Sequence, residues 1–186
     1  MDAGDNTIAG FAAELAAKQP TPGGGAAAAV TAALGCATGA MACRYTTGER
    51  YATVSAIAET CALQLDGWRI QALALADRDA AAYAAVRAAK MTKDQLVIAA
   101  AASAAAEVPA QLIRLCGEAA SVCADFRPRC NPWLVSDIDS AIHLLAGAGR
   151  AAWRTLLINQ PTDDVAAFAR AQLAALEVHD AEVPQP

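Results

Sequence analysis

"QPTPGGGAAAAV", residues 19–30, places two prolines and three glycines directly before a run of alanines. The prolines prevent a preceding helix from continuing, and the alanines favour the start of a new one. Three consecutive glycines leave backbone N–H groups uncovered, and the first turn of a helix adds unpaired N–H groups at the positive end of its dipole. The stretch therefore predicts a loop between two helices that can hold a carboxylate or phosphate, or approach a flat ring closely. The alternative is a tight interhelical turn without a ligand.

Helical periodicity continues on both sides of this loop, and no stretch alternates as a β-strand does. Pro109 is expected to open one helix and Thr162 to cap the last one. The predicted helices cover residues 7–18, 25–46, 49–89, 93–107, 109–126, 136–159 and 162–178. The sequence thus predicts a single all-α domain over residues 1–186, a multihelical bundle with one long helix, a buried central helix (136–159) and a disordered tail from about residue 180 to 186.

Composition and charge restrict the class of protein. Hydrophobic residues make up 56% of the 186 residues but aromatic residues only 5%, so closely packed alanine-rich helices are expected to form the core. The formal net charge of −5 argues against a nucleic-acid partner. Residues 26–43 carry no charge, and Gly35 and Gly39 form a G-x-x-x-G pair, as in some membrane spans. Because Ala, Gly and Thr dominate there, we expect a helix buried in protein and no membrane partner. The acidic start of the chain lacks the basic region of a signal peptide.

The six cysteines do not form a metal-binding pattern. The sequence contains no C-x-x-C pair and only two histidines, His143 and His179, so no metal site is predicted. Two pairs of cysteines are seven residues apart and so share a helix face, which favours reduced, buried thiols that pack as small hydrophobic groups. Reduced thiols indicate a cytoplasmic location.

Two aspartates are candidates for chemistry. Ser136, with Asp139 three residues later, predicts a capping box, which places Asp137 in the first turn of a helix wrapped on most sides. A carboxylate there would be partly desolvated and chemically useful, or would only complement the helix dipole, an effect of about 0.3–1 kcal/mol. Asp79 continues an apolar helical stripe toward Tyr83, so it occupies a core-facing position and needs a partner. That partner would be a ligand or an arginine such as Arg78.

These segments together resemble the cyclodeaminase/cyclohydrolase family. The matching stretches are "PTPGGGAAA" (20–28), "DAAAY" (79–83), "VP" (108–109) and "SD" (136–137) followed by Ala141, in the same order over nearly the whole chain. The resemblance implies an all-helical fold, a homodimer and a tetrahydrofolate derivative bound near the glycine loop as substrate, without a cofactor. It also implies that the enzyme hydrolyses a cyclic amidinium, or closes that ring with release of ammonia. A surplus of apolar helix faces also favours a dimer.

The resemblance carries roles over to individual positions. Asp137 matches the family's acidic motif and is predicted to be catalytic, because a fixed carboxylate can stabilise the cation and move a proton. The residues predicted to bind the substrate are Pro22, Gly23, Gly24, Gly25, Asp79, Asn131, Ser136, Thr155 and Asn159.

The chain also departs from the family pattern. Only Asn131 remains of an asparagine-rich segment before the "SD" pair, Thr155 replaces another asparagine, and Arg44 stands where relatives often have asparagine. These changes leave two alternatives open: an enzyme on the same scaffold that acts on a different imine or amidine in a biosynthetic pathway, and a helical binding module without catalysis.

Overall fold

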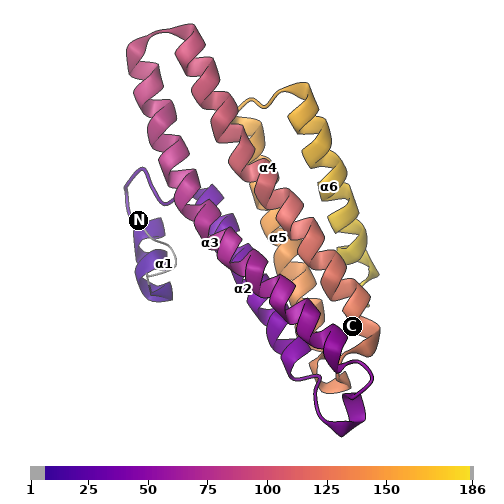
Figure 1. Cartoon of the computed structure of the whole chain (residues 1–186). Coiled ribbons are helices and arrows are strands. Elements are labelled where there is room, and N and C mark those ends of the chain that lie inside the picture. The colour runs from indigo at the N-terminus through magenta and orange to yellow at the C-terminus, as the bar shows by residue number, and fades with distance from the viewer. Residues whose placement is uncertain (1–6, 185–186) are drawn as a thin grey trace.

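The computed structural model describes residues 7–184, and within that range every regular element is helical (Figure 1). The elements in chain order are α1 (Ile8–Ala16), α2 (Gly24–Arg44), η1 (Glu49–Tyr51), α3 (Ser55–Thr92), α4 (Gln95–Phe126), η2 (Arg127–Arg129), η3 (Pro132–Leu134), α5 (Val135–Ile158) and α6 (Asp163–Glu182). The all-α prediction is confirmed.

The helices form two layers (Figure 1). α3 and α4 make a long antiparallel hairpin in front of α2 and α5, and α6 lies beside α4 and α5. α3 is the predicted long helix, with 38 residues and therefore a length of about 57 Å. It begins at Ser55 rather than at Glu49, because Glu49–Tyr51 form a separate 3₁₀ turn. The distal end of this hairpin projects beyond the other helices (Figure 1).

The prediction that Pro109 opens a helix is wrong. α4 is continuous from Gln95 to Phe126 with Pro109 inside it. A proline within a helix frees the carbonyl four residues earlier, which here belongs to Ala105. Asn159 Nδ2 of α5 donates a hydrogen bond to that carbonyl at 3.2 Å, so a side chain from another helix replaces the missing N–H.

α2 is the most deeply packed helix, with 12 of its 21 residues buried. Its glycines allow the close approach of neighbouring helices: a Cβ added at Gly39 would lie 2.8 Å from Cys123 Sγ of α4. Both α2 and the segment Gln95–Arg129 are long and apolar enough to cross a membrane by length and composition alone. The apolar window of α2 is 61% buried inside the protein, which confirms the predicted protein-buried helix, whereas that of the second segment is 39% buried.

α5 is buried along one full stripe, which comprises Ile138, Ile142, Leu145, Gly149, Ala152 and Leu156. The prediction that this helix is wrapped on most sides holds only in part, because Ala151, on the neighbouring side of α5, is exposed. Thr162 caps α6 as predicted, with its Oγ1 accepting from Val165 N–H at 3.4 Å.

The predicted disordered tail is wrong for residues 180–184, whereas residues 185–186 lie outside the described range. α6 continues to Glu182, and Val183 is buried in the core. Asp180 accepts hydrogen bonds from His143 Nδ1 at 2.6 Å and Arg150 at 2.9 Å, so polar contacts with α5 hold this end of the chain.

All six cysteines are free thiols, as predicted, and five of them are buried. Burial raises the pKa of Cys36 and of Cys43 to about 12, so these thiols stay protonated at neutral pH.

Candidate active site

A pocket of about 300 Å³ opens where the glycine loop meets α3, α4 and α5. Ligand pockets are typically about 300–1,000 Å³, so this one is at the small end. Its lining residues are Pro20, Thr21, Gly23, Gly24, Gly25, Asp79, Ala82, Tyr83, Val86, Ala105, Thr155, Ile158 and Asn159. Six of the predicted substrate-binding residues therefore meet here. Pro22 is buried and does not line the pocket, and Pro20 and Thr21 line it instead.

Asp79 holds the glycine loop in place. Its carboxylate accepts a hydrogen bond from the backbone N–H of Ala26, in the first turn of α2. A Cβ added at Gly25 would lie 2.5 Å from Asp79 Cγ, so only glycine fits beneath this carboxylate. The first turn of α2 therefore faces a carboxylate of the protein itself, Asp79. Gly24, by contrast, is exposed and has open space around it, so it is free to face a ligand.

Burial raises the pKa of the Asp79 carboxyl group above its ordinary value, although the hydrogen bond from Ala26 acts in the opposite direction. A raised pKa makes the carboxylate a stronger base. Asp79 therefore combines three features of a proton-transfer group: it lines a pocket, it is partly desolvated, and a fixed backbone group orients it.

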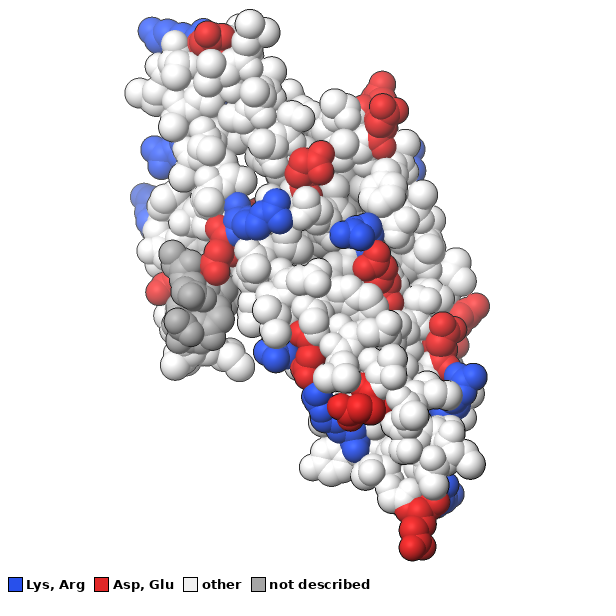
Figure 2. Space-filling view, viewed as in Figure 1, with Lys and Arg blue, Asp and Glu red and all other residues white. Residues whose placement is uncertain are grey.

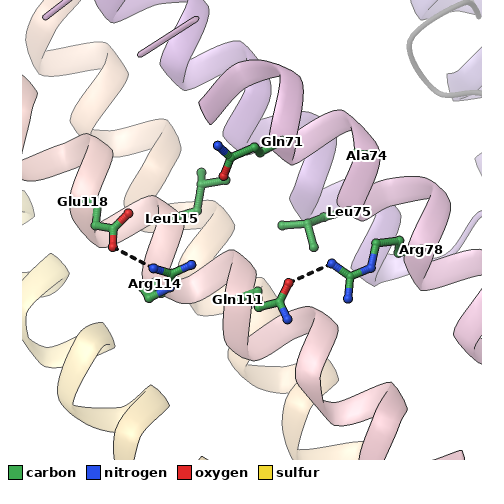
Figure 3. A pocket seen from close by; sticks show the side chains of 8 residues that line it. All are labelled: Gln71, Ala74, Leu75, Arg78, Gln111, Arg114, Leu115 and Glu118. Carbon is green, nitrogen blue, oxygen red and sulfur yellow. Dashed lines mark hydrogen bonds and ion pairs between the residues drawn. The ribbon is translucent and has the colours of Figure 1, made fainter. Parts of the chain in front are cut away.

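Arg78 is not the partner of Asp79. It lies in a different hollow of about 150 Å³ between α3 and α4, where its guanidinium donates to Gln111 Oε1 at 2.8 Å (Figure 3). Arg114 lines the same hollow and pairs with Glu118 at 3.2 Å. The space-filling view of this side of the molecule shows charged side chains of both signs scattered in small groups rather than gathered into one basic patch (Figure 2).

Thr155 and Asn159 approach the pocket from the last turns of α5. The Asn159 amide N–H₂ donates a hydrogen bond to the Ala105 carbonyl, and this bond fixes the orientation of Asn159 Oδ1. Pro109 thus acts on the pocket indirectly, since it frees the carbonyl that fixes Asn159.

The remaining predicted residues lie at the opposite end of α5. Asn131, Ser136 and Asp137 are outside the pocket, and Asp137 is about 27 Å from Thr155 along the helix. The predicted capping box is wrong: α5 begins at Val135, Leu134 takes the cap position, and Asp139 instead binds Arg127 with two hydrogen bonds of 2.6 and 3.0 Å. Asp137 does occupy the first turn, as predicted, and is partly exposed.

Thr46, which sequence reasoning missed, fixes the segment that leads to Asp137. It is buried, donates to the Ala42 carbonyl at 3.0 Å and accepts from Asn131 N–H at 3.0 Å. Asn131 Oδ1 in turn accepts from Trp133 N–H at 3.1 Å, while the Trp133 residue is 86% exposed. The neighbouring Arg44 binds Asp66 of α3 at 2.5 Å.

Comparison with known proteins identifies the family. A sequence model described as formiminotransferase-cyclodeaminase matches residues 7–177. The chain belongs to this family. A methenyltetrahydrofolate cyclohydrolase from Methylorubrum extorquens is 33% identical, with 94% of this chain and 89% of that protein covered. The crystal structure of formiminotetrahydrofolate cyclodeaminase from Thermotoga maritima has a TM-score of 0.83 and 26% identity, and covers 96% of this chain and 90% of its own.

Proposed function

We propose that this member of the formiminotransferase-cyclodeaminase family is a methenyltetrahydrofolate cyclohydrolase. The same site would also support the related cyclodeaminase reaction. The observation that carries the proposal is Asp79, a partly desolvated carboxylate that lies over the N-terminus of α2 in a pocket lined by the glycine loop. The 33% identical cyclohydrolase supports a folate substrate over the two alternatives, an unrelated amidine and a binding module.

The chemistry suits one partly buried carboxylate. The substrate carries a cationic amidinium whose carbon bridges two nitrogens, and a carboxylate at Asp79 would stabilise that charge. Water adds to this carbon while Asp79 takes one of its protons. The tetrahedral adduct then breaks one C–N bond as the proton on Asp79 passes to the leaving nitrogen, and the hydroxyl group of the adduct releases its proton to solvent, so that the ring opens to the formyl product. In the cyclodeaminase reaction the second folate nitrogen attacks the formimino carbon, its proton passes to the formimino nitrogen, and the bond from the carbon to that nitrogen breaks to release ammonia.

The other parts of the pocket position the substrate. Gly23 and Gly24 let a flat ring lie against the backbone, Tyr83 and Ile158 supply apolar walls, and Thr155 and Asn159 offer polar groups from α5. We further propose a cytoplasmic homodimer that acts on a dissolved small molecule, with neither a nucleic acid nor a membrane as partner and with no resident metal or cofactor.

The test is an absorbance assay with methenyltetrahydrofolate, whose conjugated amidinium absorbs while its hydrolysis product does not. The wild type should hydrolyse it. Asp79→Asn should lose roughly 10²–10⁴-fold in turnover, the range for a positioned proton-transfer group, because the amide cannot accept the proton. Asp125→Asn, at an exposed position on α4, serves as the control and should keep wild-type turnover. Wild-type turnover by Asp79→Asn would remove the catalytic role from Asp79.

A further inference from the structure

The pocket at the glycine-loop end of the bundle has a polar lining that determines which part of a ligand it can hold. Among the described residues that line it, Asp79 is the one with a charged side chain, and no lysine or arginine is present. The C-terminal end of α5 contributes Thr155 and Asn159. Hydrogen bonds within the chain decide whether these two side chains can donate to a ligand or accept from it.

The Asn159 amide is held in one orientation by the Ala105 carbonyl. A carbonyl accepts a hydrogen bond but cannot donate one, so Nδ2 and not Oδ1 faces it, at 3.2 Å. Ala105 is only 4% exposed, so a flipped amide would leave its carbonyl unsatisfied and opposite a second acceptor. Asn159 Oδ1 therefore points away from Ala105, and it has no hydrogen-bond partner among the described residues.

Thr155, one helical turn before Asn159, also offers an oxygen. Its hydroxyl group has one hydrogen, which it donates to the Ala151 carbonyl at 3.4 Å. The lone pairs of Oγ1 remain for a ligand. The C-terminal end of α5 thus offers the pocket two oxygen acceptors, Thr155 Oγ1 and Asn159 Oδ1.

Pro109 sets this arrangement from a different helix, although it does not line the pocket itself. Any other residue at position 109 would carry an N–H, which in a continuous α-helix donates to the carbonyl four residues earlier. The Ala105 carbonyl would then be satisfied within α4, and nothing would hold the Asn159 amide. The proline in the middle of α4 therefore decides which atom of Asn159 is available in the pocket.

We propose that Pro109 is a positioning residue for the ligand, because it leaves the Ala105 carbonyl free to hold the Asn159 amide. Asn159 Oδ1 and Thr155 Oγ1 then accept hydrogen bonds from N–H groups of the ligand. A carboxylate or phosphate would meet acceptors here and no cation, so the group that enters is a neutral or cationic ring that carries N–H donors. Under the proposed function, on which this inference rests, that group is the pteridine ring with its amino and ring N–H groups.

The kinetics of Pro109→Ala on methenyltetrahydrofolate test the positioning. With the Ala105 carbonyl satisfied by the new N–H, the Asn159 amide can take two flipped orientations and three χ1 rotamers. If these are evenly populated, about one molecule in six is competent, so KM should rise about three- to sixfold. The turnover number should stay within about twofold of wild type because Asp79 is unchanged, and the thermal unfolding midpoint should not fall, because alanine suits a helix interior.

Pro128→Ala is the matched control for this variant. It makes the same replacement at an exposed position in η2, outside the pocket, and should keep the wild-type KM. A wild-type KM in Pro109→Ala overturns the proposal, and so does a fall in turnover number with KM unchanged.

Asn159→Asp separates orientation from other effects of the proline. With Pro109 present, the carboxylate has no N–H for the Ala105 carbonyl and is repelled by it, so KM should rise. In the Pro109→Ala background that carbonyl is satisfied and the carboxylate presents an acceptor in either orientation, so the same substitution should lower KM toward the wild-type value. The added charge acts alike in both backgrounds, so a change in the same direction in both overturns the proposal.

Nuclear magnetic resonance tests the amide without a substrate. The side-chain amide signals of Asn159, identified by their absence from Asn159→Asp, should shift toward those of a solvent-exposed amide in Pro109→Ala and stay in place in Pro128→Ala. Unmoved signals in Pro109→Ala overturn the positioning role. A wild type that does not hydrolyse methenyltetrahydrofolate overturns the proposed function and with it the assignment of the pteridine ring, and the amide signals still decide whether Pro109 fixes Asn159.

Discussion

The two ends of the bundle both present an aspartate near the start of a helix, yet they build different environments around it. At the glycine-loop end, Asp79 comes from the middle of α3 and covers the N-terminus of another helix, α2, within a pocket. At the Asp137 end, the aspartate lies in the first turn of its own helix, partly exposed and outside that pocket. The arrangement around Asp79 needs contact between segments that are distant in the sequence, and it partly desolvates the carboxylate. The arrangement of Asp137 needs no such contact, because any helix can carry an aspartate in its first turn.

This difference shows that an acidic residue at a helix start is not desolvated by that position alone. Enclosure by other elements matters more, because it desolvates the carboxyl group and leaves room for a substrate beside it. The two ends also differ in how they are fixed: the first by Gly25 beneath Asp79, the second by Thr46 behind Asn131. Substitutions at these supports separate the contributions of the two ends.

The largest effect is expected at Gly25. Gly25→Ala places a Cβ against the Asp79 carboxylate, so either that side chain or the start of α2 must move. We expect at least a tenfold loss of turnover and about 1–3 kcal/mol of stability, the usual cost of overpacking. Kinetics and urea unfolding measure the two quantities. Gly67→Ala is the control, because a Cβ there meets nothing within 4 Å and Gly67 lies outside the pocket, and an equal loss from this variant would contradict the role given to Asp79.

Thr46 is the corresponding support at the Asp137 end. Thr46→Val keeps the shape of the side chain but leaves the Asn131 N–H without its acceptor. An unsatisfied buried donor costs about 1–3 kcal/mol, which denaturant unfolding should detect. Activity should fall less than in Gly25→Ala, since the pocket itself stays intact. Thr47→Val, at the exposed neighbouring position, should leave stability unchanged within about 0.5 kcal/mol.

A double-mutant cycle tests how Pro109 and Asn159 are coupled at the glycine-loop end. Asn159→Leu should cost about 1–2 kcal/mol of stability, because the Ala105 carbonyl then has no partner. In the Pro109→Ala background residue 109 regains an N–H that can bond to that carbonyl, so the same substitution should cost less by about 1 kcal/mol. Equal costs in both backgrounds would show that the bond does not compensate for the proline.

The smallest effect is expected at the C-terminal end of α6. Burial alone would raise the pKa of Asp180, but the hydrogen bonds from His143 and Arg150 outweigh it and hold the pKa below its ordinary value. A carboxyl group whose pKa is lowered by folding stabilises the protein above its unfolded pKa, near 4, and this contribution is lost as the pH falls through the folded value. Asp180→Asn should therefore lower stability by roughly 0.5–1 kcal/mol at pH 7 and by less below pH 4. Thermal unfolding at both pH values checks this, and an equal loss at both would contradict it.

The sequence by itself determined the helical class, the position of the glycine loop and the reduced state of the cysteines. Each depends on local information: alanine propensity, the break caused by Pro20 and Pro22, and thiol spacing on one helix face. The motifs also indicated the family, which the comparisons confirm.

Only the tertiary structure decided how those parts meet. It kept α4 continuous through Pro109 because Asn159, fifty residues later, supplies the missing donor, and it ordered the C-terminal end of α6 through contacts with α5. It also placed Asp79 in the pocket and Asp137 at the far end, although the sequence analysis predicted Asp137 to be the catalytic residue and Asp79 to bind the substrate. These features depend on residues that are far apart along the chain. They cannot be predicted from the helix propensity or the periodicity of one segment, because they result from packing between helices.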